Sequence, residues 1–384
     1  MTNPTPIEGP AELLARLVGI DSANPDLPAG GAGETEIADA CAAWLAGHGL
    51  EIHRLEQQPG RPSIVAIARG TGGGRSLMLN GHLDTVALGD FAGDALSPYV
   101  RDGRLYGRGA FDMKGGIVAM MVAGAHATRM PLRGDVLVTL VADEERASFG
   151  TAEVLASFSA DAAIVCEPTL EDLVVAHKGF TWFDVTVVGE AAHGSRPDLG
   201  IDAIAMAGHF LVALEALGRR LADGTANPLV GTGSIHAGVI RGGDEPSTYP
   251  GSCVITVERR MIPGEDGDTV EAELRGLLDD LAASLPSFAY RLEPSLCRDP
   301  WEADPDSPIR ATVARHAAAV LGRAVTERGE TYWTDAQLLG SAGIPTVLFG
   351  VDGGGAHAAS EWVELASVER LARVLTGVME EFCA

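Results

Sequence analysis

Positive charge is scarce in this sequence of 384 residues, and so are long apolar runs. Only 28 lysine and arginine residues stand against 53 aspartate and glutamate residues, which gives a formal net charge of −25. Because such a balance repels nucleic acid and anionic membrane surfaces, we expect neither as a partner. No run reaches the roughly eighteen apolar residues of a membrane-spanning helix, and residues 1–10 lack a basic region followed by an apolar stretch. Membrane insertion and secretion are therefore not expected.

Cysteine is also scarce, and its few copies are dispersed. The five cysteines are odd in number, lie far apart in the sequence and form no C-x-x-C pair. This pattern argues against a disulfide framework and against a thiolate zinc site, and it fits a reducing, cytoplasmic compartment. The residues are Cys41, Cys166, Cys253, Cys297 and Cys383.

Apolar residues, by contrast, are plentiful enough for a large core. They make up 46% of the chain, against 21% charged residues, and the length favours two domains. Short apolar runs bounded by glycine, proline or charged residues alternate with segments of helical periodicity, which predicts an α/β domain with three layers, α/β/α. Strands are predicted at 63–68, 76–79, 136–141, 162–166 and 346–349, and helices near 13–17, 37–45, 113–127 and 307–321.

The pattern changes after residue 179. A strand with alternating polarity, a one-sided helix, strands at 233–240 and 252–260, a second helix and a strand at 288–292 follow in the β-α-β-β-α-β order of a ferredoxin-like unit. Asp268 and Glu271 form a capping-box signature that predicts the start of the second helix. We therefore expect an inserted α+β domain at 180–297, within a discontinuous domain made of 1–179 and 298–384.

Acidic residues and histidines follow several of the predicted strands, at the sheet edge where α/β proteins place their sites. In the H-x-D segment after the strand at 76–79, His82 could ligate a metal through one ring nitrogen while Asp84 accepts the N–H of the other. A loop histidine beside a capping aspartate is the alternative. Asp112 precedes a very apolar helix, so it could be that helix's N-cap or a carboxylate that bridges two cations.

Three further segments have the same ambiguity. Residues 143–145 are three consecutive acids, which form either a solvated charge run or a cluster whose repulsion a cation relieves. Glu167 and His357 could each be an exposed loop residue. Taken together, two histidines and several carboxylates at the ends of one sheet match the nitrogen and oxygen ligands of a pair of zinc ions.

Four motifs carry a resemblance that spans nearly the whole chain. They are GHLDTV at 81–86, GRGAFDMKGG at 107–116, ADEE at 142–145 and AAHGSRP at 191–197. Their order and wording resemble the metallopeptidase and deacylase family of acetylornithine deacetylase, succinyl-diaminopimelate desuccinylase, aminoacylase and bacterial glutamate carboxypeptidase. The resemblance implies a zinc-peptidase-like domain whose inserted domain acts as a lid and dimerises.

The resemblance also implies the ligands of two divalent ions, most often zinc, with cobalt or manganese as alternatives. His82 and Glu167 would complete the coordination of one ion, Glu145 and His357 would hold the other, and Asp112 would bridge both.

Further roles follow from the same resemblance. Glu144 matches the general base, and Asp84 matches the carboxylate that orients His82. His193 matches the histidine that stabilises the oxyanion in the partner subunit's active site, which implies a homodimer. Arg260 matches the arginine that binds the substrate's carboxylate, a task that suits its planar fork.

The implied reaction is hydrolysis of the amide bond of an N-acyl amino acid or a short peptide. A di-, carboxy- or aminopeptidase remains open, as does a catalytically silent metal-binding scaffold; a nucleotide-binding protein is disfavoured because no phosphate-binding glycine motif follows a strand. Ser247 and Ser360 stand where relatives often have asparagine, which leaves a substrate contact and the loop after His357 open.

Overall fold

The computed structural model describes residues 9–27 and 30–384, and these form two compact units. The first unit consists of residues up to Val175 together with Ala303–Arg328 and Thr334–Ala384. The second consists of Ala176–Glu302 and Gly329–Trp333. Among the described residues, no helix is long and apolar enough to cross a membrane.

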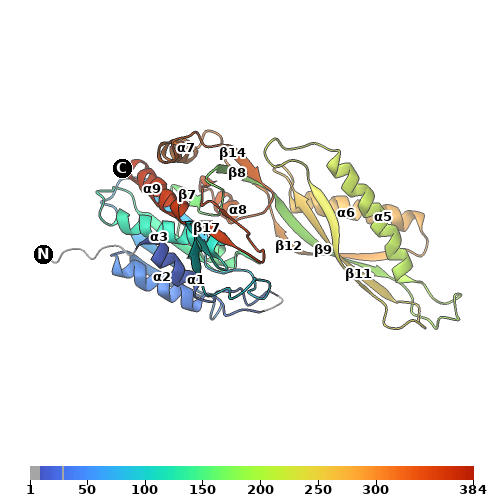
Figure 1. Cartoon of the computed structure of the whole chain (residues 1–384). Coiled ribbons are helices and arrows are strands. Elements are labelled where there is room, and N and C mark those ends of the chain that lie inside the picture. Colours follow the sequence, from blue (N-terminus) through green and yellow to red (C-terminus); the bar gives the residue numbers. More distant parts are fainter. Residues whose placement is uncertain (1–8, 28–29) are drawn as a thin grey trace. The chain divides into compact units, whose positions relative to one another are not determined.

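A mixed sheet forms the centre of the first unit (Figure 1). Its strands lie in the order β1-β2-β6-β3-β7-β15-β8, with parallel pairing from β6 through β3 and β7 to β15 and antiparallel pairing outside that range. The strand bounds are β1 (Glu51–Leu55), β2 (Ser63–Ala68), β3 (Leu77–His82), β6 (Val136–Val141), β7 (Ala162–Val165), β8 (Leu173–His177) and β15 (Thr346–Leu348). Two short strands, β13 (Trp301–Glu302) and β14 (Glu327–Glu330), also pair with β8.

The predicted α/β class is confirmed. Strands β2, β3, β6, β7 and β15 are buried along their whole length, as strands covered by helices on both faces are. The predicted ranges 63–68 and 136–141 coincide with β2 and β6. The helices of this unit are α1 (Pro10–Val18), α2 (Thr35–Gly47), α3 (Gly115–Ala127), α4 (Phe149–Leu155), α7 (Pro308–Leu321), α8 (Ala336–Ser341) and α9 (Leu365–Phe382).

Helix α3 is the central helix of this unit, and it packs against β2, β3 and β6 on one side and α9 on another (Figure 1). Nearly every residue of α3 is apolar or glycine and buried, which is why its sequence shows no polar face. A small antiparallel sheet, which the sequence did not predict, lies in the same unit. Its strands, in the order β16-β17-β5-β4, are β4 (Tyr99–Arg101), β5 (Arg104–Tyr106), β16 (Gly353–Gly354) and β17 (Trp362–Glu364).

The second unit has the predicted β-α-β-β-α-β order, and its antiparallel sheet has the order β10-β11-β9-β12. Alternate residues of β9 and β11 form a core with α5 and α6 on one face of the sheet, while the residues between them stay partly exposed. The elements are β9 (Gly179–Val188), α5 (Ala203–Ala222), β10 (Ser234–Gly242), β11 (Ser252–Met261), α6 (Gly267–Ser284) and β12 (Ala289–Arg298).

The predicted capping box of α6 is wrong by two residues. The N-cap is Asp266, whose side chain accepts a hydrogen bond from the backbone N–H of Thr269 at 2.7 Å. Glu271 instead bonds Arg275 one turn further along the helix. Asp266 is the N-cap because its extended backbone lets its carboxylate reach the N–H groups of the first turn, whereas Asp268 already lies within the helix.

Candidate metal centre

The carboxyl ends of the parallel strands bring the predicted ligands together. His82 is the last residue of β3, Glu144 and Glu145 follow β6 by three and four residues, and Glu167 follows β7 by two. His357 lies in the loop between β16 and β17, beyond the end of β15. Since β6, β3, β7 and β15 are neighbours and parallel, their ends meet at one edge of the sheet.

Asp112 reaches this edge from a turn, and it is not a helix cap. It lies in the π-helical turn η1 (Ala110–Lys114), with φ −116° and ψ 92°, and the N-cap of α3 is Lys114, without a side-chain cap bond. The cap interpretation is therefore wrong. One carboxylate oxygen, Oδ1, lies 3.2 Å from Nε2 of His82, and the other, Oδ2, lies 3.3 Å from Nε2 of His357.

Two groups of ligand-type atoms share Asp112. In the first, Nε2 of His82 lies 3.5 Å from Oε1 of Glu167, and in the second, Nε2 of His357 lies 3.1 Å from Oε2 of Glu145. The ligand atoms within each group lie within 4.8 Å of one another, so each group could hold a metal ion. The other oxygen of Glu145, Oε1, is buried without a hydrogen-bond partner among the described residues, as an oxygen awaiting a cation would be.

The electrostatics of the cluster also favour cations. Burial, reinforced by the repulsion among neighbouring carboxylates, raises the pKa of Glu144 and of Glu167 well above the usual range and raises that of Glu145. Hydrogen bonds to Asp112 and Glu145 raise the pKa of His357 to about 10, so in the protein alone an imidazolium supplies part of the missing positive charge. Residues 143–145 are consequently not a solvated charge run: Asp143 is buried and the side chain of Glu145 is 6% exposed.

The loop interpretation is wrong for His82, which is the last residue of β3, and the exposed-loop interpretation is wrong for Glu167, whereas His357 does lie in a loop. His82 and Glu167 are buried, at 1% and 5% exposure. His357 keeps a side chain that is 53% exposed, so one side of the second ligand group faces solvent. An opening of this kind is what a substrate needs in order to reach the ions.

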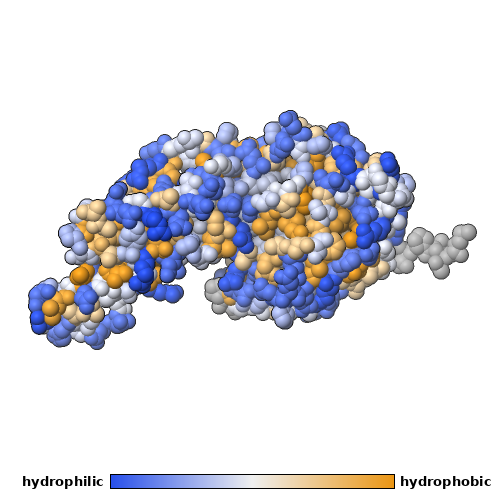
Figure 2. Space-filling view, turned by 180° about the vertical axis from the view of Figure 1, so that it is seen from behind, coloured by the Kyte–Doolittle hydropathy of each residue, from blue (hydrophilic) through white to orange (hydrophobic). Residues whose placement is uncertain are grey.

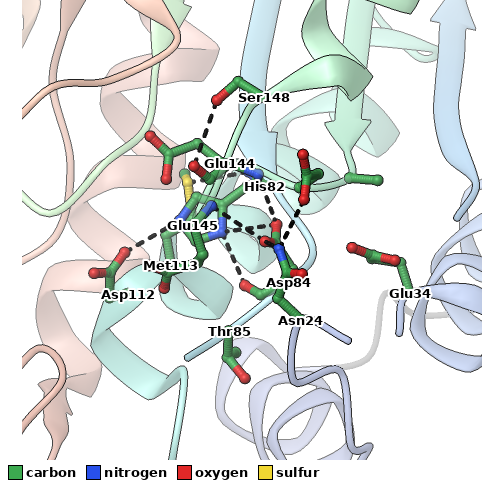
Figure 3. A network of polar contacts seen from close by, with 12 residues as sticks. Asn24, Glu34, His82, Asp84, Thr85, Asp112, Met113, Glu144, Glu145 and Ser148 are labelled. Carbon is green, nitrogen blue, oxygen red and sulfur yellow. Dashed lines mark hydrogen bonds and ion pairs between the residues drawn. The ribbon is translucent and has the colours of Figure 1, made fainter. Parts of the chain in front are cut away.

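Asp84 holds the backbone of the acidic segment (Figure 3). Its two carboxylate oxygens accept hydrogen bonds from the backbone N–H groups of Glu144 and Glu145, at 3.1 and 3.2 Å. Nδ1 of His82 lies 2.9 Å from the backbone carbonyl of Asp84 and 3.6 Å from its carboxylate. Asp84 thus orients the imidazole mainly through its carbonyl, while its carboxylate positions the next ligand segment.

Several residues beside the cluster were missed by the sequence analysis. Asn24 donates to the carboxylate of Asp84 at 2.8 Å (Figure 3). It also donates to the carboxylate of Asp143, at 3.0 Å. Arg61, also buried, donates to Glu34 and, at 3.2 Å, to Asp143. These contacts join segments that lie 27 to 119 residues apart, so no local pattern signals them.

The remaining predicted site residues lie in the second unit. His193 is exposed in the loop between β9 and α5, where Nδ1 lies 2.8 Å from Oγ of Ser195. The backbone N–H of the next residue donates to the carbonyl of Ser247, so the segment that departs from the family pattern borders the histidine loop. Arg260, on β11, bonds Glu258 at 2.8 Å and lies over the ring of Phe180 at 5.2 Å.

Comparison with known proteins finds a family model, a relative in sequence and solved structures that this chain resembles. Residues 78–381 match the model described as peptidase family M20/M25/M40. An acetylornithine deacetylase from Myxococcus xanthus is 32% identical over 385 residues, which cover 96% of each chain. Among solved structures, an aminopeptidase from Bacillus cereus has a TM-score of 0.80 at 18% identity, covering 100% of each chain. A dinuclear metal binding peptidase of the M20 family from Bacillus subtilis has a TM-score of 0.75 at 14% identity, covering 97% of each chain.

Proposed function

The chain belongs to peptidase family M20/M25/M40, a family of metal-dependent hydrolases, and on that premise we propose that it removes the acyl group from an N-acyl amino acid. The relative of highest identity named above is a deacetylase, which favours an amide with a small acyl group over a peptide bond. The peptidases among the similar structures share the fold at less than 25% identity, so they carry no weight on the substrate.

The observation that carries the proposal is the pair of ligand groups joined by Asp112. Each group offers one imidazole nitrogen and two carboxylates, counting the shared one, and this nitrogen and oxygen set suits zinc, with cobalt or manganese as substitutes. We assign His82 and Glu167 to one ion and Glu145 and His357 to the other. The two divalent ions, when bound, would activate a water molecule and polarise the substrate's carbonyl oxygen.

Glu144 is the proposed proton carrier. It directly precedes the ligand Glu145, and its backbone is held by Asp84, so its side chain is delivered to the edge of the cluster. Burial and the nearby Glu167 raise the pKa of Glu144 well above the usual range, so its carboxylate binds a proton more strongly than an exposed glutamate does. In its ionised form Glu144 takes a proton from the attacking water and then gives that proton to the departing amine.

Arg260 is the proposed anchor for the substrate's carboxylate. It lines a pocket of about 340 Å³ together with Lys178, Ser234, Thr331 and Tyr332, all within the second unit. Burial and the nearby Arg260 lower the pKa of Lys178, the mark of a locally cationic site. A carboxylate would relieve this repulsion and bond the guanidinium fork.

We further propose a homodimer in which His193 stabilises the oxyanion in the partner subunit's site. The long edge strand β10 is exposed along nearly its whole length, with Val239 and Ile240 44% and 51% exposed, and unpaired edges favour pairing with a second chain. Figure 2 shows hydrophobic residues, in orange, among hydrophilic ones, in blue, on the surface of this unit. A monomeric variant that keeps full turnover would refute the role of His193.

The test is hydrolysis by zinc-loaded protein of a panel of N-acetyl-ornithine, N-succinyl-diaminopimelate, other N-acyl amino acids and dipeptides. We expect turnover of an acyl substrate that a chelator abolishes, that added zinc restores, and that Glu144→Gln lacks while still binding metal. Turnover of dipeptides alone would replace the deacylase proposal by a peptidase. Absence of turnover across the panel, with both ions bound, would support a silent scaffold.

A further inference from the structure

Glu361 is a buried carboxylate outside the two ligand groups, yet it touches the turn that carries their shared member. Its side chain is 1% exposed. Oε1 accepts hydrogen bonds from the backbone N–H groups of Phe111 and Asp112, each at 3.0 Å. Oε2 accepts from the backbone N–H of Gly109 and from Nη1 of Arg108, again each at 3.0 Å. One carboxylate therefore receives four donors from one turn.

This arrangement is costly for the fold. Arg108 is 1% exposed, and its Nε and Nη2 have no hydrogen-bond partner among the described residues. Within that part of the chain its side-chain hydrogen bond is the pairing of Nη1 with Glu361. Burying an ion pair in this way seldom stabilises a protein more than apolar side chains of similar volume would. The pair instead gives the turn at Asp112 a single conformation, because each backbone donor meets an acceptor at a defined place.

Glu361 also belongs to the loop that carries a ligand. It lies four residues after His357, and its backbone carbonyl accepts from the N–H of Gly107 at 3.2 Å. The residue thus fastens the turn of Asp112 to the loop of His357, two segments about 250 residues apart. These two segments supply two of the three ligands of the second group, and Asp112 serves both groups.

We propose that Glu361 is a positioning residue of the metal centre, which holds the bridging Asp112 and the loop of His357 in register. The inference rests on the two-metal centre of the proposed function. Residues that orient metal ligands typically contribute about 10- to 100-fold to metal affinity. Because Glu361 orients the shared ligand, its loss lowers the affinity for both ions. The affinity for the ion at His357 falls more, since Glu361 also holds the loop of His357.

Glu361→Gln tests this role with little change in volume. Glutamine has one acceptor oxygen, so its NH₂ group must face two of the four donors, and the turn has to shift. Glu364→Gln is the matched control, because Glu364 lies three residues further along and pairs with Arg104 at 2.8 Å, away from the turn of Asp112. Both variants are stripped with chelator and titrated with Zn²⁺ by calorimetry and with Co²⁺ by visible absorption.

We expect Glu361→Gln to bind the ion at His357 about 10- to 100-fold less tightly than the wild type does, with an altered Co²⁺ absorption spectrum. We expect Glu364→Gln to match the wild type in both measurements. Two ions bound at wild-type affinity by folded Glu361→Gln would overturn the proposal. If that variant does not fold, Glu361→Asp is titrated in its place. Aspartate keeps both carboxylate oxygens but holds them further from the donors of the turn, because its side chain is shorter. Failure of both to fold, with Glu364→Gln intact, would assign Glu361 to stability alone. A wild-type protein that binds no ion would instead refute the metal centre itself.

Discussion

The buried carboxyl group of Asp335 allows a prediction of stability with a defined sign and size. Asp335 is 1% exposed, and Oδ2 accepts a hydrogen bond from Oγ1 of Thr151 at 2.7 Å. The other oxygen, Oδ1, makes no hydrogen bond within the described part of the chain. Burial raises the pKa of Asp335 from 3.8 to about 6. Replacement by asparagine removes the charge and keeps an oxygen that Thr151 can bond.

The sign follows from the proton affinity of the two states. The folded protein holds the proton of Asp335 more tightly than the unfolded chain, so ionisation costs stability as the pH rises between the two pKa values. The cost is absent well below pH 3.8 and complete above the folded pKa of about 6. At 1.36 kcal/mol per pH unit, the difference between the two pKa values corresponds to about 3 kcal/mol at pH 8 and to roughly half of that at pH 5.

Asp335→Asn should therefore stabilise the protein relative to the wild type, and this gain in the free energy of unfolding should roughly double from pH 5 to pH 8. Urea unfolding of both proteins across this range measures it. The proteins are kept free of metal, because a cation near Glu144 and Glu167 would favour the ionised carboxylate. Asp39→Asn, at an exposed side chain, controls for the loss of one negative charge. A free-energy difference that stays constant from pH 5 to pH 8 would refute the reasoning.

Three other substitutions test the catalytic residue, the ligand backbone and the second core. Glu144→Gln should lower kcat by about 10²- to 10⁴-fold with two ions still bound, and a loss below tenfold would contradict its role as proton carrier. Gly350→Ala should destabilise the first unit and weaken metal binding in a Zn²⁺ titration, because the added Cβ would lie 1.8 Å from the backbone oxygen of Glu167; unchanged affinity would show that the strand end can move. Phe210→Ala should lower the free energy of unfolding of the second unit by about 3–5 kcal/mol, because Phe210 is fully buried in the core of that unit. Urea unfolding measures this loss, and a smaller value would mean that α5 moves to fill the cavity.

The sequence predicted those parts of the fold whose signal is local. Continuous apolar runs at 63–68 and 136–141 became β2 and β6 without a shift, because short runs of this kind are typical of strands covered on both faces. The helix at 113–127 was predicted two residues too early. Its first residues form the π-helical turn at Asp112, and only contacts with Glu361 and with the histidines of the cluster account for that conformation. The small sheet was missed because its strands have two or three residues each.

For the metal centre, the acidic residues can be recognised in the sequence, but the basic residues that balance the negative charge around them can be identified only in the structure. Histidines and carboxylates at strand ends are visible as motifs, since each lies beside a recognisable apolar run. Arg61 pairs with Glu34, and Arg108 pairs with Glu361, in both cases behind the ligands. The partners lie 27 and 253 residues apart in the sequence, so no local pattern predicts these pairs. Arg61 lies in the connection between β1 and β2, and Arg108 follows β5 of the small sheet by two residues, so the parallel strand order alone does not predict either position. In a chain with a net charge of −25, these two buried guanidinium groups pair with acids around the centre, whereas the ligand carboxylates pair with the two histidines of the cluster. The Nε2 atoms of these histidines would bind the cations, so the cations would take over the balancing of the carboxylate charge.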